Sequence, residues 1–271
     1  MEPSKHVNID GDVINYAVGF ASQRTLYEIG GKRFEDKASA IVYALDVADE
    51  EITTVYEAEP VAFALSSCKR LIKRIKEESK ATSATILLTG EGNFRDAVAT
   101  IQPYKGNRDG SSKPLNFQSI RDYLLFVAGA EMVEGEEADD QLSIRAVRDG
   151  ATIATIDKDL DNTAGWHYNW QRDTLYYVTE VQADRNFYRQ LFVGDTTDHI
   201  PGLFRVTGQR ATAKIKAPLD EMKTPREMYE HVRDVYAEAA PELDVAATLL
   251  EIGRLLWMRR SDGEMWSPPN G

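Results

Sequence analysis

The chain has 271 residues, of which 42% are hydrophobic and 28% are charged, and its net charge is −12. These values are typical of a soluble globular protein with a sizeable core, and the acidic balance argues against a nucleic-acid binder held by overall charge. No apolar run reaches the roughly 18 residues of a membrane span, and we expect no signal peptide. The single cysteine, Cys68, excludes an internal disulfide and a cysteine-based zinc site, so we expect a cytoplasmic protein with a half-buried packing thiol.

Apolar periodicity predicts alternating strands and helices along the chain. Three short apolar runs, at 6–10, 84–89 and 151–156, are predicted to be buried strands. Helical spacing is found over 12–22, 38–48, 59–80, 114–129 and 138–149. Two stretches with turn residues between β-like runs, 25–35 and 165–179, predict hairpins, and everything after about 182 is expected to be helical. Strands that alternate with helices predict an α/β fold with a parallel sheet.

Positive charge is concentrated in one part of this acidic chain. Residues 61–121 contain eleven Lys or Arg against five Asp or Glu. The stretch 69–80 is either the solvated face of a basic helix or a surface for a polyanion, and the sequence alone leaves both open.

Acidic residues gather where the predicted strands and helices begin or end. In open parallel sheets, ligands bind beyond the carboxyl ends of the strands. The acids in question are Asp10, Glu137, Asp139, Asp140, Asp157, Asp159, Asp195 and Asp198. Any one of these clusters can be explained as a helix N-terminus, which favours acidic residues. Together they require cations, and oxygen ligands without Cys or His indicate Mg²⁺ or Mn²⁺.

Two families begin with a comparable first strand. IDGDV (residues 9–13) resembles the D-x-D-x-[TV] of phosphatases of the haloacid dehalogenase type, and IDGD also resembles the first-strand aspartate of metal-dependent 5′ nucleases. Four later motifs, QPYKGNRDG, EEADDQ, TIDKDLDN and GDTTDHIPGL, resemble the 5′ nucleases in content and in order. The chain is therefore similar, from about Val7 to Ala217, to flap endonucleases, the 5′-nuclease domain of polymerase I and, above all, phage 5′→3′ exonucleases. The phosphatase alternative explains neither EEADDQ nor YKGNR.

This resemblance implies a fold and a domain arrangement. It implies a PIN-like nuclease core with a parallel sheet at 1–180, which includes a helical arch at about 104–130. It also implies a helical C-terminal module at 181–271, with a helix-hairpin-helix (H3TH) at about 198–215. A phage protein of this kind would act in the cytoplasm of the host cell.

The resemblance also implies the reaction and its ligands. Such an enzyme hydrolyses DNA to 5′-phosphate products with two Mg²⁺ ions, for which Mn²⁺ can substitute, at duplex ends, 5′ flaps and RNA–DNA hybrids such as primers. The more tightly held ion would take Asp10, Glu137, Asp139 and Asp157, with Glu91 as a helper. The second ion would take Asp140, Asp159, Asp195 and Asp198.

Basic and aromatic residues are implied as substrate contacts. Lys105 and Arg108 of YKGNR would contact the scissile phosphate, and Arg95 is a further phosphate candidate. Tyr104 would stack on the terminal base, unless it is a packing aromatic. The implied DNA-binding residues, some of them at a hairpin that often holds K⁺, are Lys113, Gly202, Gly208, Arg210 and Lys214.

Two positions depart from the family pattern. Gly90 in TGEGNFR occupies the place of an aspartate that the family usually carries after the second strand, and Glu91 is the nearest acid that could replace it. His199 stands where Asn is usual and is expected to be a capping or turn residue. The missing aspartate leaves open a DNA-structure-binding protein that has lost catalysis. A ribonuclease of the wider PIN-like group is a further alternative.

Overall fold

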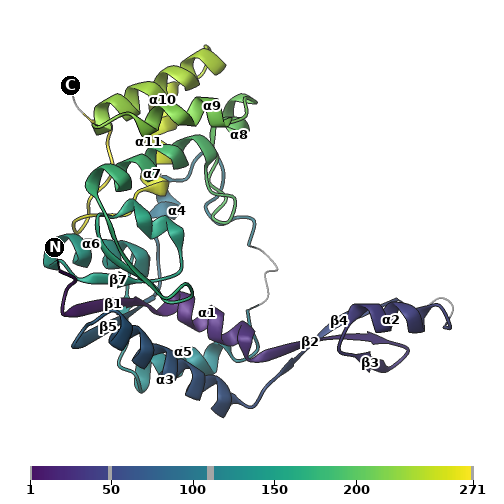
Figure 1. Cartoon of the computed structure of the whole chain (residues 1–271). Helices are drawn as coiled ribbons and strands as arrows, with labels where there is room; N and C mark the ends of the chain where they lie inside the picture. Colours follow the sequence, from purple (N-terminus) through teal and green to yellow (C-terminus); the bar gives the residue numbers. More distant parts are fainter. Residues whose placement is uncertain (1, 48–50, 109–112, 270–271) are drawn as a thin grey trace. The chain divides into compact units, whose positions relative to one another are not determined.

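The computed structural model describes residues 2–47, 51–108 and 113–269. The molecule forms two compact units (Figure 1). The first comprises Met1–Asp10, Ile75–Ser111 and Glu131–Gly271, and the second comprises Gly11–Arg74 and Ser112–Ala130. Because these units do not coincide with a boundary near residue 180, the division into a nuclease core and a helical module stays a prediction.

A six-stranded sheet forms the centre of the first unit. Its order is β6-β5-β1-β7-β8-β9, and every neighbouring pair is parallel except β8–β9. The strands are β1 (His6–Asp10), β5 (Ser83–Thr89), β6 (Glu131–Val133), β7 (Thr152–Ala154), β8 (Gly165–Asn169) and β9 (Thr174–Val178). The predicted α/β class with a mostly parallel sheet is therefore confirmed, as are the three predicted strands and the hairpin at 165–179.

The core of the sheet explains why these short runs form strands. Ile9, Leu87 and Ile153, one from each central strand, are completely buried. Continuous apolar runs are typical of parallel strands because both faces of such a sheet are covered. Helix α6 (Ala138–Asp149) lies against β1 and β5 and adds Leu142 to this core.

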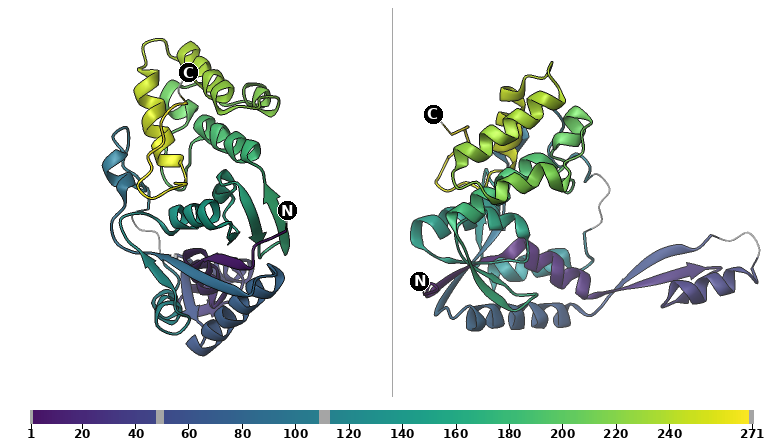
Figure 2. Two further views of the ribbon diagram at one scale, coloured as in Figure 1. Left: turned by 90° about the vertical axis from the view of Figure 1, so that its left-hand side faces the viewer. Right: turned by 45° about the horizontal axis from the view of Figure 1, so that its top comes forward.

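The helices that follow the sheet share a second apolar core in the same unit. They are α7 (Glu180–Val193), α8 (Leu203–Thr207), α9 (Ala213–Lys216), α10 (Pro225–Ala239) and α11 (Val245–Leu256), with the 3-10 turn η2 (Ala217–Asp220). The other 3-10 turn, η1 (Lys158–Asn162), lies between β7 and β8. Thr179 and Thr224 begin α7 and α10, and each accepts a backbone N–H that the first turn leaves without a helical partner. Phe187, Met228 and Ile252 are fully buried where α7, α10 and α11 meet, and Figure 2 shows these three helices gathered together.

The second unit contains a small antiparallel sheet and most of the remaining helices. The elements are α1 (Gly11–Ala21), β2 (Gln23–Ile29), β3 (Lys32–Phe34), α2 (Lys37–Ala44), β4 (Thr53–Ala58), α3 (Val61–Glu78), whose last four residues belong to the first unit, and α5 (Phe117–Phe126). The hairpin predicted at 25–35 is confirmed as β2–β3, while β4 was not predicted. Most β4 side chains are exposed, so the strand lacks the buried alternation that would have marked it.

Two other expectations concern single segments. The predicted arch at about 104–130 contains α5, but its residues 109–112 lie outside the described part of the chain. Within the described ranges, no helix is long and apolar enough to cross a membrane.

The thiol of Cys68 is more deeply placed than the sequence suggested. We expected a half-buried side chain, but Cys68 in α3 has 0% exposure, and burial raises its pKa to about 12. The thiolate is the reactive species, so a raised pKa and a covered sulfur both slow its reactions.

We therefore predict that Cys68 resists Ellman's reagent in the native protein. At pH 8 the reaction should be at least about 100-fold slower than in urea, where the pKa returns to its ordinary value of about 8.5. Absorbance of the released thiolate gives both rates. Native protein that reacts as fast as unfolded protein would contradict the packing of α3.

Candidate functional site

The carboxyl edge of the parallel sheet holds the first two acids. Asp10 ends β1, and Asp157 follows β7, which pairs directly with β1. Asp10 is 1% exposed, and its Oδ2 accepts a hydrogen bond of 2.8 Å from Thr155 Oγ1. Thr155 Oγ1 in turn accepts the backbone N–H of Asp157 at 3.0 Å. Thr155 therefore fixes the loop of Asp157 against the end of β1.

Two further carboxylates, those of Asp159 and Asp195, lie near Asp157 beside η1. Asp157 Oδ1 caps this turn by accepting the N–H of Asp159 at 2.9 Å, and Asp159 Oδ1 accepts from Gln190 Nε2 at 2.7 Å. Burial, the nearby charge of Asp157 and a hydrogen bond with Asp195 raise the pKa of Asp159 to about 7. Negative charge is thus in excess at this point, a condition that a bound cation would relieve.

The loop that carries Asp195 is closed by its own backbone. Asp195 and Ile200 exchange backbone hydrogen bonds of 2.9 and 2.7 Å. Gly194 has φ 65°, and a Cβ there would lie 2.4 Å from Ile200 O. A Cβ on Gly202 would lie 2.4 Å from the carbonyl carbon of Val193. Only glycine fits at these two positions because the obstacle is main chain in both cases.

Two residues next to Asp198, His199 in the chain and Lys105 in space, have left-handed backbone conformations. His199 has φ 58°, a left-handed conformation in which Asn, Asp and His are enriched, so it is a turn residue as the sequence suggested. Lys105 is also left-handed, with φ 53°, and its N–H donates to Asp198 O at 2.9 Å. The segment that begins at Tyr104 is therefore tied to the acidic loop by main-chain contacts.

Basic side chains of this segment lie on two acids. The ammonium of Lys105 pairs with Glu137 and lies 3.7 Å from Asp198 Oδ2, and the guanidinium of Arg108 pairs with Asp198. The Tyr104 hydroxyl lies 2.9 Å from Glu137 Oε2 and 2.8 Å from Asp198 Oδ2. Its one proton can be donated to only one of them at a time. Lys105 and Arg108 thus supply positive charge where the two acids meet.

Burial and neighbouring charges compete at these two acids. Burial alone would raise the pKa of Glu137, but Lys105 and Arg95 outweigh it, so the pKa of Glu137 is lowered. For Asp198 burial prevails over Lys105, and its pKa is raised. Burial and the charge of Glu137 raise the pKa of Tyr104, which keeps its hydroxyl protonated at neutral pH.

A buried ion pair lies behind the acidic edge. Arg95, in α4 (Phe94–Val98), is 1% exposed and contacts both oxygens of Asp140, with Nη1–Oδ2 2.6 Å and Nη2–Oδ1 3.0 Å. Its remaining donors reach Leu255 O and Trp257 O, each at 2.9 Å. Arg95 therefore joins the start of α6 to the C-terminal end of α11.

Three roles predicted from the sequence do not fit these positions. Asp140 was expected to hold the second ion, but both of its oxygens accept from Arg95. Arg95 was expected to contact phosphate, but its guanidinium is enclosed and makes four hydrogen bonds within the chain. Tyr104 was expected to stack on a base, but it is only 9% exposed and belongs to the helical core, which agrees with the packing alternative.

The predicted hairpin region contains two short helices joined by a turn. Gly202 precedes α8, and Gly208 ends it with φ 81°. Thr212 caps α9 by accepting the N–H of Ile215. Arg210 stands in the turn, 5.9 Å from the Phe204 ring, and Lys214 is exposed on α9.

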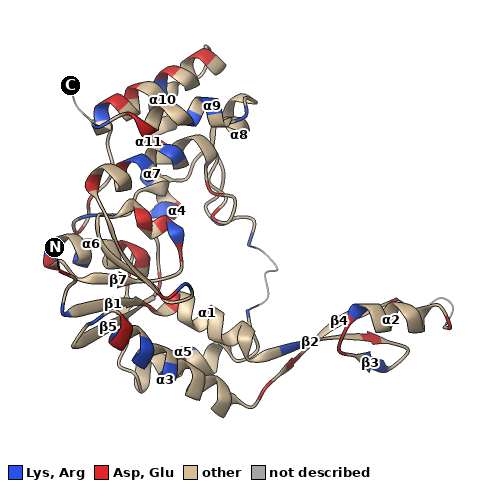
Figure 3. Cartoon of the chain, viewed as in Figure 1, with Lys and Arg blue, Asp and Glu red and all other residues tan. Residues whose placement is uncertain are grey.

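Basic residues of the second unit form a separate set. The Nζ of Lys113 lies 4.7 Å from the centre of the Phe117 ring. Figure 3 shows the Lys and Arg along α3, of which Lys69, Arg70, Lys73 and Arg74 are exposed. This exposure is compatible with both interpretations of the basic stretch, a solvated face and a polyanion surface.

Several residues next to the predicted site were not recognised in the sequence. Thr155 and Gln190, which orient Asp10 and Asp159, carry no motif of their own. Glu134 follows β6 directly, and its Oε2 accepts the N–H of Glu91 at 2.6 Å. Glu91 itself is exposed. The position of Glu134 at a strand end was the one available signal, but β6 is only three residues long.

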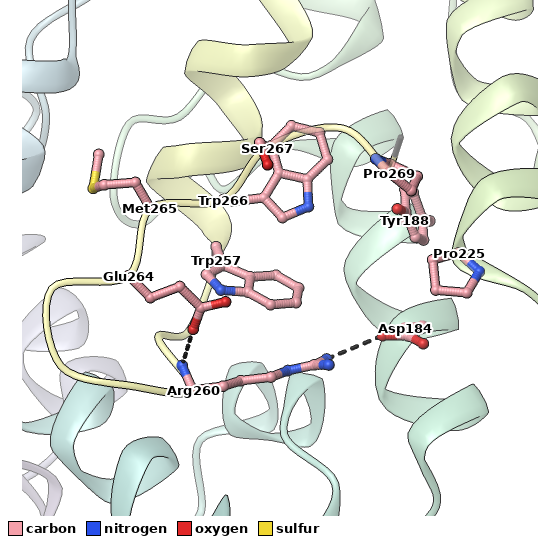
Figure 4. Close-up of a pocket in the computed structure, with 10 residues that line it drawn as sticks. All are labelled: Asp184, Tyr188, Pro225, Trp257, Arg260, Glu264, Met265, Trp266, Ser267 and Pro269. Atoms are coloured by element: carbon pink, nitrogen blue, oxygen red, sulfur yellow. Dashed lines mark hydrogen bonds and ion pairs between the residues drawn. The ribbon is translucent and has the colours of Figure 1, made fainter. Parts of the chain in front are cut away.

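A pocket of about 220 Å³ lies elsewhere in the first unit, near the C-terminal segment (Figure 4). Its lining includes Trp257, Trp266 and Arg260, whose guanidinium pairs with Asp184 at 3.0 Å. The guanidinium also lies 4.3 Å from the Trp257 ring centre. None of the predicted site residues lines this pocket.

The donor set at the acidic edge fits a hard divalent cation. Among the described residues, no three Asp, Glu, His or Cys side chains converge closely enough to hold an ion as they stand. Lys105 and Arg108 instead neutralise Glu137 and Asp198. The available ligands are all carboxylate oxygens, which Mg²⁺ and Mn²⁺ prefer. The raised pKa of Asp159 agrees with a place meant for added positive charge.

Comparisons with known proteins identify the fold. No protein-family model and no curated protein sequence matches the chain. A bacteriophage T5 protein co-crystallised with metal ions is similar over 93% of this chain and 88% of its own, with a TM-score of 0.52 and 14% identity. The chain has the fold of a phage 5′ nuclease.

Two further T5 structures resemble the chain more distantly. One is the same phage protein, named a flap endonuclease, in a pseudo-enzyme–product complex with DNA and metal ions; it has a TM-score of 0.49, 14% identity, and 92% and 88% coverage of the two chains. The other is a mutant of the T5 5′-exonuclease, with a TM-score of 0.45, 13% identity, and 92% and 98% coverage. At 14% identity, the similarity to the first T5 structure shows the fold alone, and the activity is a separate question.

We predict that Asp140 is required for stability. The variant Asp140→Asn leaves Arg95 buried with a neutral partner, so the free energy of unfolding should fall by about 3–5 kcal/mol. Urea unfolding in EDTA measures this without any contribution from metal. The matched control Asp149→Asn removes an exposed acid at the other end of α6 and should change the free energy of unfolding far less, because exposed charges contribute little. Equal losses for the two variants would contradict the structural role of the pair.

Proposed function

We propose that the chain is a divalent-metal-dependent 5′ nuclease. It would hydrolyse DNA phosphodiester bonds as a 5′→3′ exonuclease and as a structure-specific 5′-flap endonuclease, with 5′-phosphate products, and it would also remove RNA primers. The observation that carries this proposal is the placement of Lys105 and Arg108 directly on Glu137 and Asp198. A phosphate-binding pair of cations beside acids at a sheet edge is the arrangement that phosphoryl chemistry needs.

The acids would hold two Mg²⁺ ions, or Mn²⁺ in their place. Asp10, Glu137, Asp139 and Asp157 would serve the tighter ion, with Glu91 within reach of it. Asp159, Asp195 and Asp198 would serve the second. When bound, the ions supply an activated water and neutralise the charge of the scissile phosphate. The likeness of the fold to a T5 protein co-crystallised with metal ions supports this assignment.

When substrate binds, Lys105 and Arg108 would leave the carboxylates and contact the phosphate instead. A phosphate oxygen offers these cations the same charge-assisted hydrogen bonds that the carboxylates now accept. The left-handed backbone of Lys105 and its N–H bond to Asp198 O keep the segment in place during the exchange. Positive charge would then lie where negative charge develops in the transition state.

Duplex DNA would be held outside the catalytic centre, at duplex ends, 5′ flaps and RNA–DNA hybrids. We infer that α8, the following turn and α9 form a helix-hairpin-helix that binds the backbone through main-chain N–H groups, with a K⁺ at the turn. Gly202 and Gly208 shape it, and Arg210 and Lys214 add charge. Lys113 is proposed as a DNA contact in its own right. Such contacts position DNA without selecting a sequence.

Gly90 supports one competing proposal, a DNA-structure-binding protein of the same fold with weakened catalysis. The phosphatase alternative has less support, because Asp12, which it would need as an acid, lies 3.3 Å from the guanidinium of Arg121.

We predict metal-dependent cleavage that requires Asp157. A 5′-labelled duplex and a 5′-flap substrate are incubated with Mg²⁺, Mn²⁺ or EDTA. The wild type should release 5′-phosphorylated products only with metal, and Asp157→Ala should lower the rate about 100-fold or more, because metal-site residues that act even indirectly contribute 10–100-fold. Asp149→Ala, an exposed control, should cleave as the wild type does.

The products separate the alternatives. Mononucleotides indicate an exonuclease, and flap-length fragments indicate an endonuclease. Binding of the flap substrate without cleavage in either metal would refute the nuclease proposal in favour of the binding protein.

A further inference from the structure

Gly90 and Glu134 lie side by side at the ends of neighbouring strands. In the parallel β5–β6 pair, Thr89 is opposite Val133, so the next residues of the two strands continue at the same level. Gly90 N donates to Val133 O at 2.7 Å, which extends the ladder by one step. A Cβ built on Gly90 would lie 2.4 and 2.5 Å from Oε1 and Oε2 of Glu134. The Glu134 carboxylate therefore fills the space in which any side chain at position 90 would begin.

The whole carboxylate of Glu134 lies against the Cβ position of residue 90, with Oε1 at 2.4 Å and both Cδ and Oε2 at 2.5 Å. The Glu134 carboxylate is therefore at the end of β5, although it comes from the neighbouring strand. The carboxylate is held there because Oε2 accepts the N–H of Glu91 at 2.6 Å. A carboxylate has about four lone-pair positions, so one hydrogen bond leaves capacity for a cation.

The neighbouring strands show why a carboxylate matters at this place. β1, which pairs with β5 on the other side, ends at Asp10, and the next strand is followed by Asp157. β5 stands between β6 and β1, yet it ends in a glycine. Glu134 leans from β6 over the end of β5 and supplies the carboxylate that the strand itself lacks.

We propose that Glu134 is a metal ligand of this site and takes the place of an acid at position 90. The proposal rests on the metal-dependent function proposed above and adds a residue to it. It also explains why position 90 is a glycine. Because Gly90 has no side chain, the Glu134 carboxylate can lie against it, and on this proposal a glycine at position 90 does not indicate lost catalysis. The simpler role for Glu134, a cap for the Glu91 amide, involves the same hydrogen bond but no metal.

Binding of Mn²⁺ to the full-length chain separates these two roles. In Glu134→Gln the amide oxygen can still accept the Glu91 N–H, whereas the negative charge is lost. Electron paramagnetic resonance, which detects free Mn²⁺, should show at least 10-fold weaker binding at the tighter site. The control Glu131→Gln removes an exposed acid from the other end of β6 and should change the affinity less than twofold. Equal thermal midpoints in EDTA verify that all variants fold.

A reciprocal exchange tests the shared space. Gly90→Asp alone should weaken Mn²⁺ binding because its Cβ collides with the Glu134 carboxylate. The double variant Gly90→Asp with Glu134→Ala removes the collision and restores one carboxylate, so its affinity should return to within about threefold of wild type.

The outcomes distinguish the failure of each proposal. Wild-type affinity in Glu134→Gln would overturn the ligand role and leave Glu134 a cap, and a loss in Glu91→Gln alone would assign the ligand to Glu91. A wild-type chain that neither binds Mn²⁺ nor cleaves DNA would overturn the proposed function together with this inference.

Discussion

The buried contact between Arg95 and Asp140 is the interaction on which the rest of the site depends. It joins α4, the first turn of α6 and the main chain at the C-terminal end of α11, three segments that are distant in the sequence. Buried charges are tolerated when they are paired and hydrogen-bonded, and this guanidinium is paired with Asp140 and makes four hydrogen bonds within the chain. Because Asp140 is fixed, the helix start that carries Glu137 is fixed as well.

Charge balance is the second constraint. The acidic edge gathers like charges, and burial together with the charge of Asp157 raises the pKa of Asp159. Lys105 and Arg108 offset this repulsion at Glu137 and Asp198, and a divalent cation would do so more strongly. We therefore propose that Lys105 and Arg108 neutralise Glu137 and Asp198 only until metal and substrate bind. The metal ions would then neutralise the acids, and the two basic side chains would contact the phosphate.

Features set by neighbouring residues in the sequence could be predicted, whereas contacts that depend on how strands and helices pack together could not. The strands that end at Asp10 and before Asp157 are recognisable because each is a short apolar run followed by an acid. The pairing of Asp140 with Arg95, and the occupation of the Gly90 space by Glu134, arise only when β5, β6 and α6 are placed together. Motif spacing alone therefore assigned Asp140 to a metal and treated Glu91 as the nearest substitute for the missing aspartate.

The most direct test of the account is a crystal structure with Mn²⁺, in which anomalous scattering locates the ions independently of the protein coordinates. We predict one peak within coordination distance of Asp10 and Asp157 and another beside Asp159 and Asp195. Saturating Mn²⁺ without a peak at these acids would contradict the proposed metal site.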